Sequence, residues 1–321
     1  MISKVSKKIK ILLLIIKVKL KTNFNISFKL TTFYSRWEVI TDSIDDSIEF
    51  HNCNKATFKN LSKFKKSNTL FILGSGPSIN LVSDQNWEKI AKSDSIGFNK
   101  FMAHNFVPTF YHYEGEISYL DTTIEVFNIR KKDFKNIPII FNAWHWDIIN
   151  NGIKDLEFLN KENLYFSNPR KYTGLNENEL SDMLYKIYNN ILYRKETFLF
   201  HHSSSLILMI TFAVMMKYKE IVLIGFDLYD NNYFYLEKNL HLNDCVNVFY
   251  KKSYDTYTAN KTKQHLTTQV EKVGDISENN TIDTFKIVKK SVLDPLEIKI
   301  YSASKKSLLN EFIDPYENFF V

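Results

Sequence analysis

Short apolar runs alternate with helix-forming stretches from residue 69 to residue 313. Each run stops at a glycine or a polar side chain, which is typical of a buried strand. These runs cover residues 70–73, 95–98, 109–113, 137–142, 221–224 and 298–301. Helical spacing indicates helices over residues 86–92, 177–193, 206–216, 283–290 and 307–313. Because strands that alternate with helices form parallel sheets, the pattern predicts an α/β fold: a doubly wound, Rossmann-like and mostly parallel sheet with helices on both faces.

The first apolar run ends in a glycine turn, Gly74, Ser75, Gly76, Pro77 and Ser78. Without side chains on the glycines, backbone N–H groups can approach a phosphate closely, and a helix that starts near Ser78 points its positive end at the same anion. Paired glycines also serve the geometry of a turn alone. The turn therefore predicts either a nucleotide site or a structural turn.

Polar residues also follow the other predicted strands, where ligands of open α/β sheets bind. Asn99 follows the second run and can contact a base or ribose, or cap a loop. Ser203, Ser204 and Ser205 precede the apolar helix, where hydroxyls cap the helix or hold a carboxylate or phosphate. Tyr229 lies just beyond the strand at 221–224. These positions form the candidate binding edge.

Two long excursions separate the sheet elements. Residues 152–194 are rich in aromatic residues and predict a lid or small subdomain, whereas residues 239–280 are polar and predict a mobile loop over the site. The second stretch contains His241 and His265. A histidine in a loop is either a surface group or a proton acceptor, so both histidines are candidates.

Composition fits one principal domain in a reducing compartment. The 321 residues are 44% hydrophobic, enough for a large core. Cys53 and Cys245 are the only cysteines, so neither a disulfide framework nor a zinc knuckle is predicted.

The amino-terminal segment concentrates positive charge. Residues 1–21 contain many lysines and no acidic residue, and the apolar run at 11–16 is too short to span a membrane. We expect residues 1–22 to form a basic amphipathic segment on an anionic membrane surface, with a packed first helix as the alternative. The expected location is cytoplasmic, peripheral on the inner face of the membrane, with no nucleic-acid partner. An N-terminal extension over 23–68 then leads into a domain over 69–321.

Most of the range from residue 70 to residue 313 resembles the bacterial sialyltransferases of glycosyltransferase family 42. The likeness is carried by residues 203–229, where a serine pair, an apolar helix, Tyr-Lys-Glu-Ile and Gly-x-Asp-x-Tyr follow in order. It implies a variant GT-A fold with a lid near 230–280. It also implies an inverting, metal-independent transferase without a cofactor, which moves a nonulosonic acid from a CMP donor to a hydroxyl of a glycan or glycolipid acceptor. Homo-oligomer formation stays open.

The resemblance also assigns roles to the nucleotide-binding positions. Gly74, Gly76, Pro77 and Ser78 match the turn that holds CMP, while Ser75 replaces the usual Asn. Asn99 matches a nucleotide contact, and His112 stands where the family has a further Asn.

The resemblance also assigns roles to residues that contact the donor sugar and the leaving phosphate. Ser203 and Ser204 match the residues that bind the donor carboxylate in the family. Ser205 stands in place of the usual Gly, and His201 in place of the usual Arg. Tyr229 matches one of two tyrosines on the leaving phosphate. Tyr235 is expected to be the second, with Tyr233 as its alternative, and His265 is expected to be the general base, with His241 in reserve.

Three alternatives stand beside this hypothesis. One is a non-catalytic partner protein that keeps the nucleotide fold and recruits a glycan assembly to the membrane. Another is a metal-dependent transferase that uses a UDP-sugar. A dinucleotide-dependent oxidoreductase is disfavoured, because the turn lacks the third glycine of the usual fingerprint.

Overall fold

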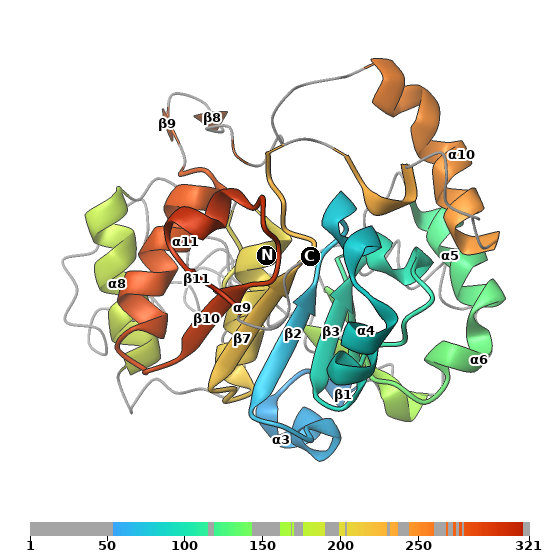
Figure 1. The fold of residues 1–321 in the computed structure, drawn as a ribbon. Coiled ribbons are helices and arrows are strands. Elements are labelled where there is room, and N and C mark those ends of the chain that lie inside the picture. Colours follow the sequence, from blue (N-terminus) through green and yellow to red (C-terminus); the bar gives the residue numbers. More distant parts are fainter. Residues whose placement is uncertain are drawn as a thin grey trace, which may run out of the picture.

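A computed structural model describes residues 54–114, 119–142, 161–167, 169, 176–189, 199–202, 204–229, 232–236, 244–259, 268, 272–273, 276–277 and 279–316. These residues form a central sheet in which every pair of neighbouring strands is parallel (Figure 1). Across the sheet the strands are β1 (Asn54–Lys55), β6 (Leu164–Ser167), β5 (Ile139–Asn142), β4 (Phe110–Tyr113), β3 (Asp94–Phe98), β2 (Thr69–Leu73), β7 (Glu220–Ile224), β10 (Lys299–Ser302) and β11 (Asp314–Pro315).

Strand β2 shows why the strands read as unbroken apolar runs. Leu70 and Ile72 pack into the core on one face of the sheet, and Phe71 and Leu73 pack into the core on the other. Successive side chains of a strand point to opposite faces, so a sheet covered on both sides needs apolar residues at every position. The predicted α/β fold with helices on both faces is confirmed.

Two groups of helices cover the two faces. One face carries α8 (Glu177–Asn189), α9 (Ser205–Met215) and α11 (Thr281–Val288), which continues as a π-helix over Lys289–Leu293. The other face carries α4 (Asp84–Ala91), α5 (Leu120–Ile129), α6 (Lys131–Phe134) and α10 (Asp244–Ala259). A short helix, α3 (Phe58–Leu61), follows β1.

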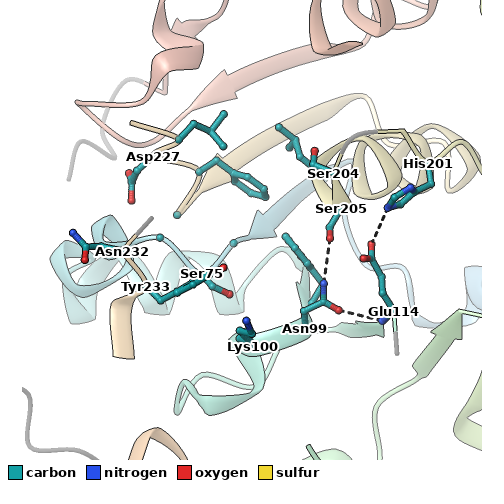
Figure 2. A pocket seen from close by; sticks show the side chains of 17 residues that line it. Ser75, Asn99, Lys100, Glu114, His201, Ser204, Ser205, Asp227, Asn232 and Tyr233 are labelled. Carbon is teal, nitrogen blue, oxygen red and sulfur yellow. Dashed lines mark hydrogen bonds and ion pairs between the residues drawn. The ribbon is translucent and has the colours of Figure 1, made fainter. Parts of the chain in front are cut away.

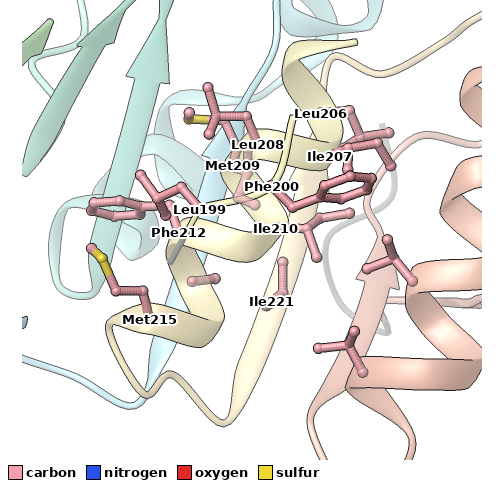
Figure 3. Close-up of a cluster of buried hydrophobic side chains, with 14 of the residues drawn as sticks. Leu199, Phe200, Leu206, Ile207, Leu208, Met209, Ile210, Phe212, Met215 and Ile221 are labelled. Atoms are coloured by element: carbon pink, nitrogen blue, oxygen red, sulfur yellow. The ribbon is translucent and has the colours of Figure 1, made fainter. Parts of the chain in front are cut away.

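Helix α9 is the most deeply buried of the described helices. Figure 3 shows apolar side chains leaving it in every direction, among them Ile207, Ile210 and Phe212, all of which are fully buried. A helix that is hydrophobic all round must have protein on every side. Sheet strands and helices α8 and α11 share its core cluster, and they hold the helix, and thus its first turn, in a fixed position.

The structure corrects three expectations about the elements. Strand β1 pairs with β6, so the sheet begins before the boundary expected at residue 69. The stretch expected to be a loop over 239–280 contains α10, whose Cys245, Val246 and Phe249 are buried, and a small hairpin of β8 (Lys272–Val273) and β9 (Ile276–Ser277). The helices expected near Ser78 and over 307–313 are short 3₁₀ turns, Pro77–Leu81 and Leu308–Glu311.

Helix α10 was missed because polar residues separate the apolar ones along its sequence. Cys245, Val246 and Phe249, its buried side chains, recur at the spacing of a single helix face, and Lys, Asn and Asp occur among the other residues of the helix. No helix among the described residues is long and apolar enough to cross a membrane.

Candidate active site

A pocket with a volume of about 370 Å³ opens at the carboxyl ends of the central strands (Figure 2). From β2 the chain moves outward through β3, β4, β5 and β6, and then returns to place β7 on the opposite side of β2. The strand order therefore reverses between β2 and β7. In open α/β sheets such a switch point separates the loops that leave the two strands and creates a ligand crevice.

Six segments of the chain line this pocket. The exit of β2 contributes Gly74, Ser75 and Gly76, and the exit of β3 contributes Phe98, Asn99 and Lys100. Glu114 follows β4, and residues 225–228 follow β7. His201, Ser204, Ser205 and Leu206 come from the start of α9, and Asn232 and Tyr233 from the segment beyond β7. The pocket thus gathers the strand exits that the sequence singled out.

The glycine turn packs directly against the exit of β7. The N–H groups of Gly74 and Gly76 donate to the carbonyls of Ile224 and Gly225, at 2.8 and 2.9 Å. A methyl group at Gly74 would lie 2.4 Å from the carbonyl oxygen of Gly225. The glycines are therefore required for close approach of two backbone segments.

This packing changes the expected role of the turn. The Ser78 N–H donates to Asp227 Oδ2 at 2.9 Å, Pro77 has no N–H, and the Gly74 and Gly76 donors are already used. The N–H of Ser75 has no acceptor among the described residues. In this conformation Ser75 is the residue of the turn that offers both a backbone N–H and a hydroxyl to a ligand, whereas Pro77 and Ser78 lie outside the pocket lining.

Asn99 joins three of the pocket segments. Its backbone has a φ of +47°, a conformation that asparagine tolerates better than most residues. Its side-chain N–H donates to Ser205 Oγ at 3.2 Å, and its Oδ1 accepts from the N–H of Glu114 at 3.1 Å. Asn99 therefore lines the pocket as predicted and also ties the exits of β3 and β4 to α9.

The start of α9 presents its positive end to the pocket. Ser204 occupies the N-cap position, but its side chain does not cap the helix, and the first turn has no acidic residue. The Ser204 hydroxyl is buried and has no hydrogen-bond partner among the described residues. Helix N–H groups and a hydroxyl of this kind suit a carboxylate or phosphate.

A histidine and a glutamate meet at one end of the pocket. His201 Nε2 lies 3.7 Å from Glu114 Oε1, and the two side chains are 14% and 19% exposed. An imidazolium at this distance attracts the carboxylate. Both residues line the pocket, and the fold brings them together by placing the exit of β4 beside the segment that leads into α9.

His112 lies behind that pair and does not line the pocket. It is fully buried in β4, with Nε2 3.0 Å from Ser167 Oγ. Burial, followed by the charge of the nearby His201, lowers the pKa of His112 to about 3, so the ring is neutral in the folded protein. The expected nucleotide contact is thus replaced by a core position, because every residue of β4 is buried.

The two candidate tyrosines beyond β7 have different environments. Tyr233 lines the pocket, whereas Tyr235 is completely buried among Tyr233, Phe234 and Phe249. The rings of Tyr233 and Tyr235 are stacked, with centroids 5.3 Å apart. Tyr233 is therefore the tyrosine placed to reach a ligand, contrary to our expectation for Tyr235, and Tyr229 lies outside the lining.

Three expected site residues, Ser203, His241 and His265, lie outside the described residues. Sequence reasoning gave no role to Lys100 or Asp227, although each directly follows or belongs to a strand exit. Their position at the exit of a predicted strand was the signal that could have identified them. Among the described residues no cluster of three His, Cys, Asp or Glu side chains could hold a metal ion.

The fold and pocket define an α/β Rossmann-like protein with a pocket at the carboxyl edge of a parallel sheet. No protein-family model matches the chain, and no curated protein matches it. Among solved structures, the apo form of an alpha-2,3-sialyltransferase from Campylobacter jejuni aligns with 78% of this chain and 82% of its own, at 13% identity and a TM-score of 0.40.

Proposed function

We propose that this protein is a glycosyltransferase that moves a nonulosonic acid from a CMP donor to a hydroxyl of a glycan or glycolipid acceptor. One observation carries the proposal. The segment that resembles family 42 in sequence has its two ends, Ser204 and Ser205 at one and residues 225–228 at the other, in the same pocket as the glycine turn. Residues separated by about half of the chain thus converge on a single cavity at the switch point of the sheet.

The two ends of the pocket suit the two halves of such a donor. Ser75 and Asn99 offer donors and acceptors to the nucleotide, and Tyr233 offers a neutral hydroxyl to its phosphate. The uncapped start of α9 with Ser204 suits the carboxylate of the sugar. In this arrangement the pocket holds the donor across the carboxyl ends of β2, β3 and β7.

The reaction is a single displacement. The acceptor oxygen forms a bond to the anomeric carbon, the bond from that carbon to the phosphate oxygen breaks, and its electron pair leaves with CMP. A base takes the hydroxyl proton, and His265 is the proposed base. We propose that no metal takes part and that the basic residues 1–22 hold the enzyme at the inner face of the membrane.

Hydrolysis of CMP donors tests the proposal, because it needs no knowledge of the acceptor. We expect release of CMP from at least one member of a panel of CMP-nonulosonic acids, and slower release by His265→Ala and Tyr233→Phe. Unchanged CMP release by both variants would contradict the proposed mechanism. Turnover only with a UDP-sugar and manganese would favour the metal-dependent alternative, and CMP binding without turnover of any donor would favour the non-catalytic partner.

A tyrosine pair sharpens the same assay. Tyr233→Phe removes a pocket hydroxyl and is expected to slow release by about 10- to 100-fold, as the loss of a donor to a developing anion does. Tyr235→Phe changes a buried ring outside the lining and is expected to stay within a few fold of the unmodified protein. The opposite order would return the role to Tyr235.

A further inference from the structure

Lys100 is the only lysine or arginine among the described residues that line the pocket. It belongs to the 3₁₀ turn Asn99–Ala103 at the exit of β3, and its ammonium lies close to two tyrosine rings. Its Nζ is 4.1 Å from the centroid of Tyr119 and 4.8 Å from the centroid of Tyr233. Figure 2 shows the lysine at the pocket beside Asn99.

Both rings are themselves held in place. Tyr233 stacks on the buried Tyr235, and Tyr119 stacks on the buried Phe249 of α10 with ring centroids 6.2 Å apart. An ammonium over aromatic faces gains cation–π attraction and loses part of its water shell. Its side chain is thus partly ordered before a ligand arrives, which lowers the entropy lost on binding.

The two carboxylates of the pocket differ in their partners. Asp227 accepts from the Ser78 N–H and from Ser304 Oγ, and Glu114 lies against His201. The two hydrogen bonds to Asp227 partly offset its negative charge. An anion that enters the pocket meets the positive start of α9 on one element and the ammonium of Lys100 on another.

We propose that Lys100 binds the phosphate of the nucleotide and stabilises it as it leaves, with Tyr119 as a positioning residue. The inference rests on the proposed function. The donor phosphodiester has a single negative charge, and cleavage of the bond to the anomeric carbon gives the phosphate a second one. A cation already oriented at that oxygen stabilises the transition state more than the bound donor. Lys100 then supplies the charge that a metal ion supplies in other nucleotide-sugar enzymes.

Binding of CMP and cytidine by the full chain tests the assignment. Titration calorimetry compares the unmodified protein with Lys100→Met, which keeps the apolar stem and removes the charge, and with Lys100→Arg. The matched control is Lys92→Met, which makes the same charge change at an exposed position outside the pocket. Lys100→Met is expected to lower the ratio of CMP affinity to cytidine affinity by about 10- to 100-fold. Lys100→Arg and the control are expected to retain most of it.

Tyr119→Leu tests the positioning role. We expect a smaller fall in the same ratio, with a steeper dependence on salt than in the unmodified protein, because the ammonium is then more hydrated. If Lys100→Met binds CMP as well as the unmodified protein does, the inference is overturned.

Other nucleotides separate this inference from the proposed function. Suppose that the unmodified protein binds AMP, GMP or UMP instead of CMP, and that Lys100→Met weakens this binding more than it weakens binding of the corresponding nucleoside. The CMP assignment then fails, and the role of Lys100 in phosphate binding is supported. Equal binding by both proteins overturns the role of Lys100 alone. Absence of binding to any of these nucleotides overturns both.

Discussion

The carboxylate of Asp227 accepts a hydrogen bond from the backbone N–H of Ser78 at 2.9 Å, and so joins the two turns that frame the pocket. Its second oxygen accepts from Ser304 Oγ at 2.8 Å, beyond the end of β10. Only 2% of Asp227 is exposed. One buried carboxylate thus links the exits of β2, β7 and β10 and helps to hold the backbone around the pocket in place.

Asp227→Ala should destabilise the protein and loosen the glycine turn. The change leaves a buried N–H and a buried hydroxyl without their acceptor, at a cost of about 2–4 kcal/mol in the free energy of unfolding. Urea unfolding measures this. Asp182→Ala removes an exposed carboxylate that pairs with Lys186 on α8 and should change stability by less than about 0.5 kcal/mol. Equal effects of the two substitutions would contradict the linking role.

Gly76→Ala should weaken both stability and nucleotide binding. Its backbone has an ordinary φ of −70°, so the obstacle is space: a methyl group would lie 2.4 Å from Asp227 Oδ2 and 2.8 Å from the carbonyl oxygen of Gly225. Such overpacking costs about 1–3 kcal/mol. Unfolding and CMP titration measure the two effects, and Ser75→Ala at the neighbouring pocket position should leave stability nearly unchanged.

A double-mutant cycle checks the contact behind that prediction. Because Gly76 and Asp227 touch, Gly76→Ala should cost less when Asp227 is already alanine, with a coupling of about 0.5–3 kcal/mol. Additive costs would show that the clash with Gly225 alone matters.

The buried His112 should make stability fall with acid. Its pKa is lowered to about 3 from an ordinary 6.5, so between these values the unfolded chain binds more protons than the folded protein. The free energy of unfolding therefore rises with pH across this window, by up to about 1.4 kcal/mol per pH unit from this residue. The stabilisation is complete above pH 6.5 and is lost as the pH falls toward 3.

His112→Gln isolates that contribution. Urea unfolding measures the free energy of unfolding between about pH 4.5 and about pH 7. The slope of this free energy against pH should be shallower for the variant, whatever its stability at neutral pH. His104 adds a similar slope in both proteins, because burial and then Arg130 lower its pKa to about 4. Parallel slopes for the two proteins would refute the prediction.

Deleting residues 1–21 should release the protein from anionic vesicles while leaving CMP binding in place. The segment contains many lysines and no acidic residue. Each lysine near an anionic surface contributes about 1 kcal/mol. Sedimentation with vesicles at low and high salt measures the effect, and full retention of the shortened protein would count against the anchor.

The strands and the central helix were predictable because their burial leaves few choices. A parallel sheet covered on both faces needs continuous apolar runs such as Leu70–Leu73, and a helix enclosed on every side needs the pattern of α9. The amphipathic α10 was not recognised, since a single apolar stripe among polar residues resembles a loop with scattered aromatic residues.

At the site, chain order and strand polarity were enough to bring the exits of β2, β3, β4 and β7 to one edge. Only the tertiary structure decided which of two close residues faces the pocket: Tyr233 or Tyr235, Glu114 or His112. It also decided that the N–H groups of the glycine turn bind the exit of β7, which leaves Ser75 for a ligand. Local sequence places a residue at a strand exit, but the direction of its side chain and the partner of its N–H depend on segments more than a hundred residues away.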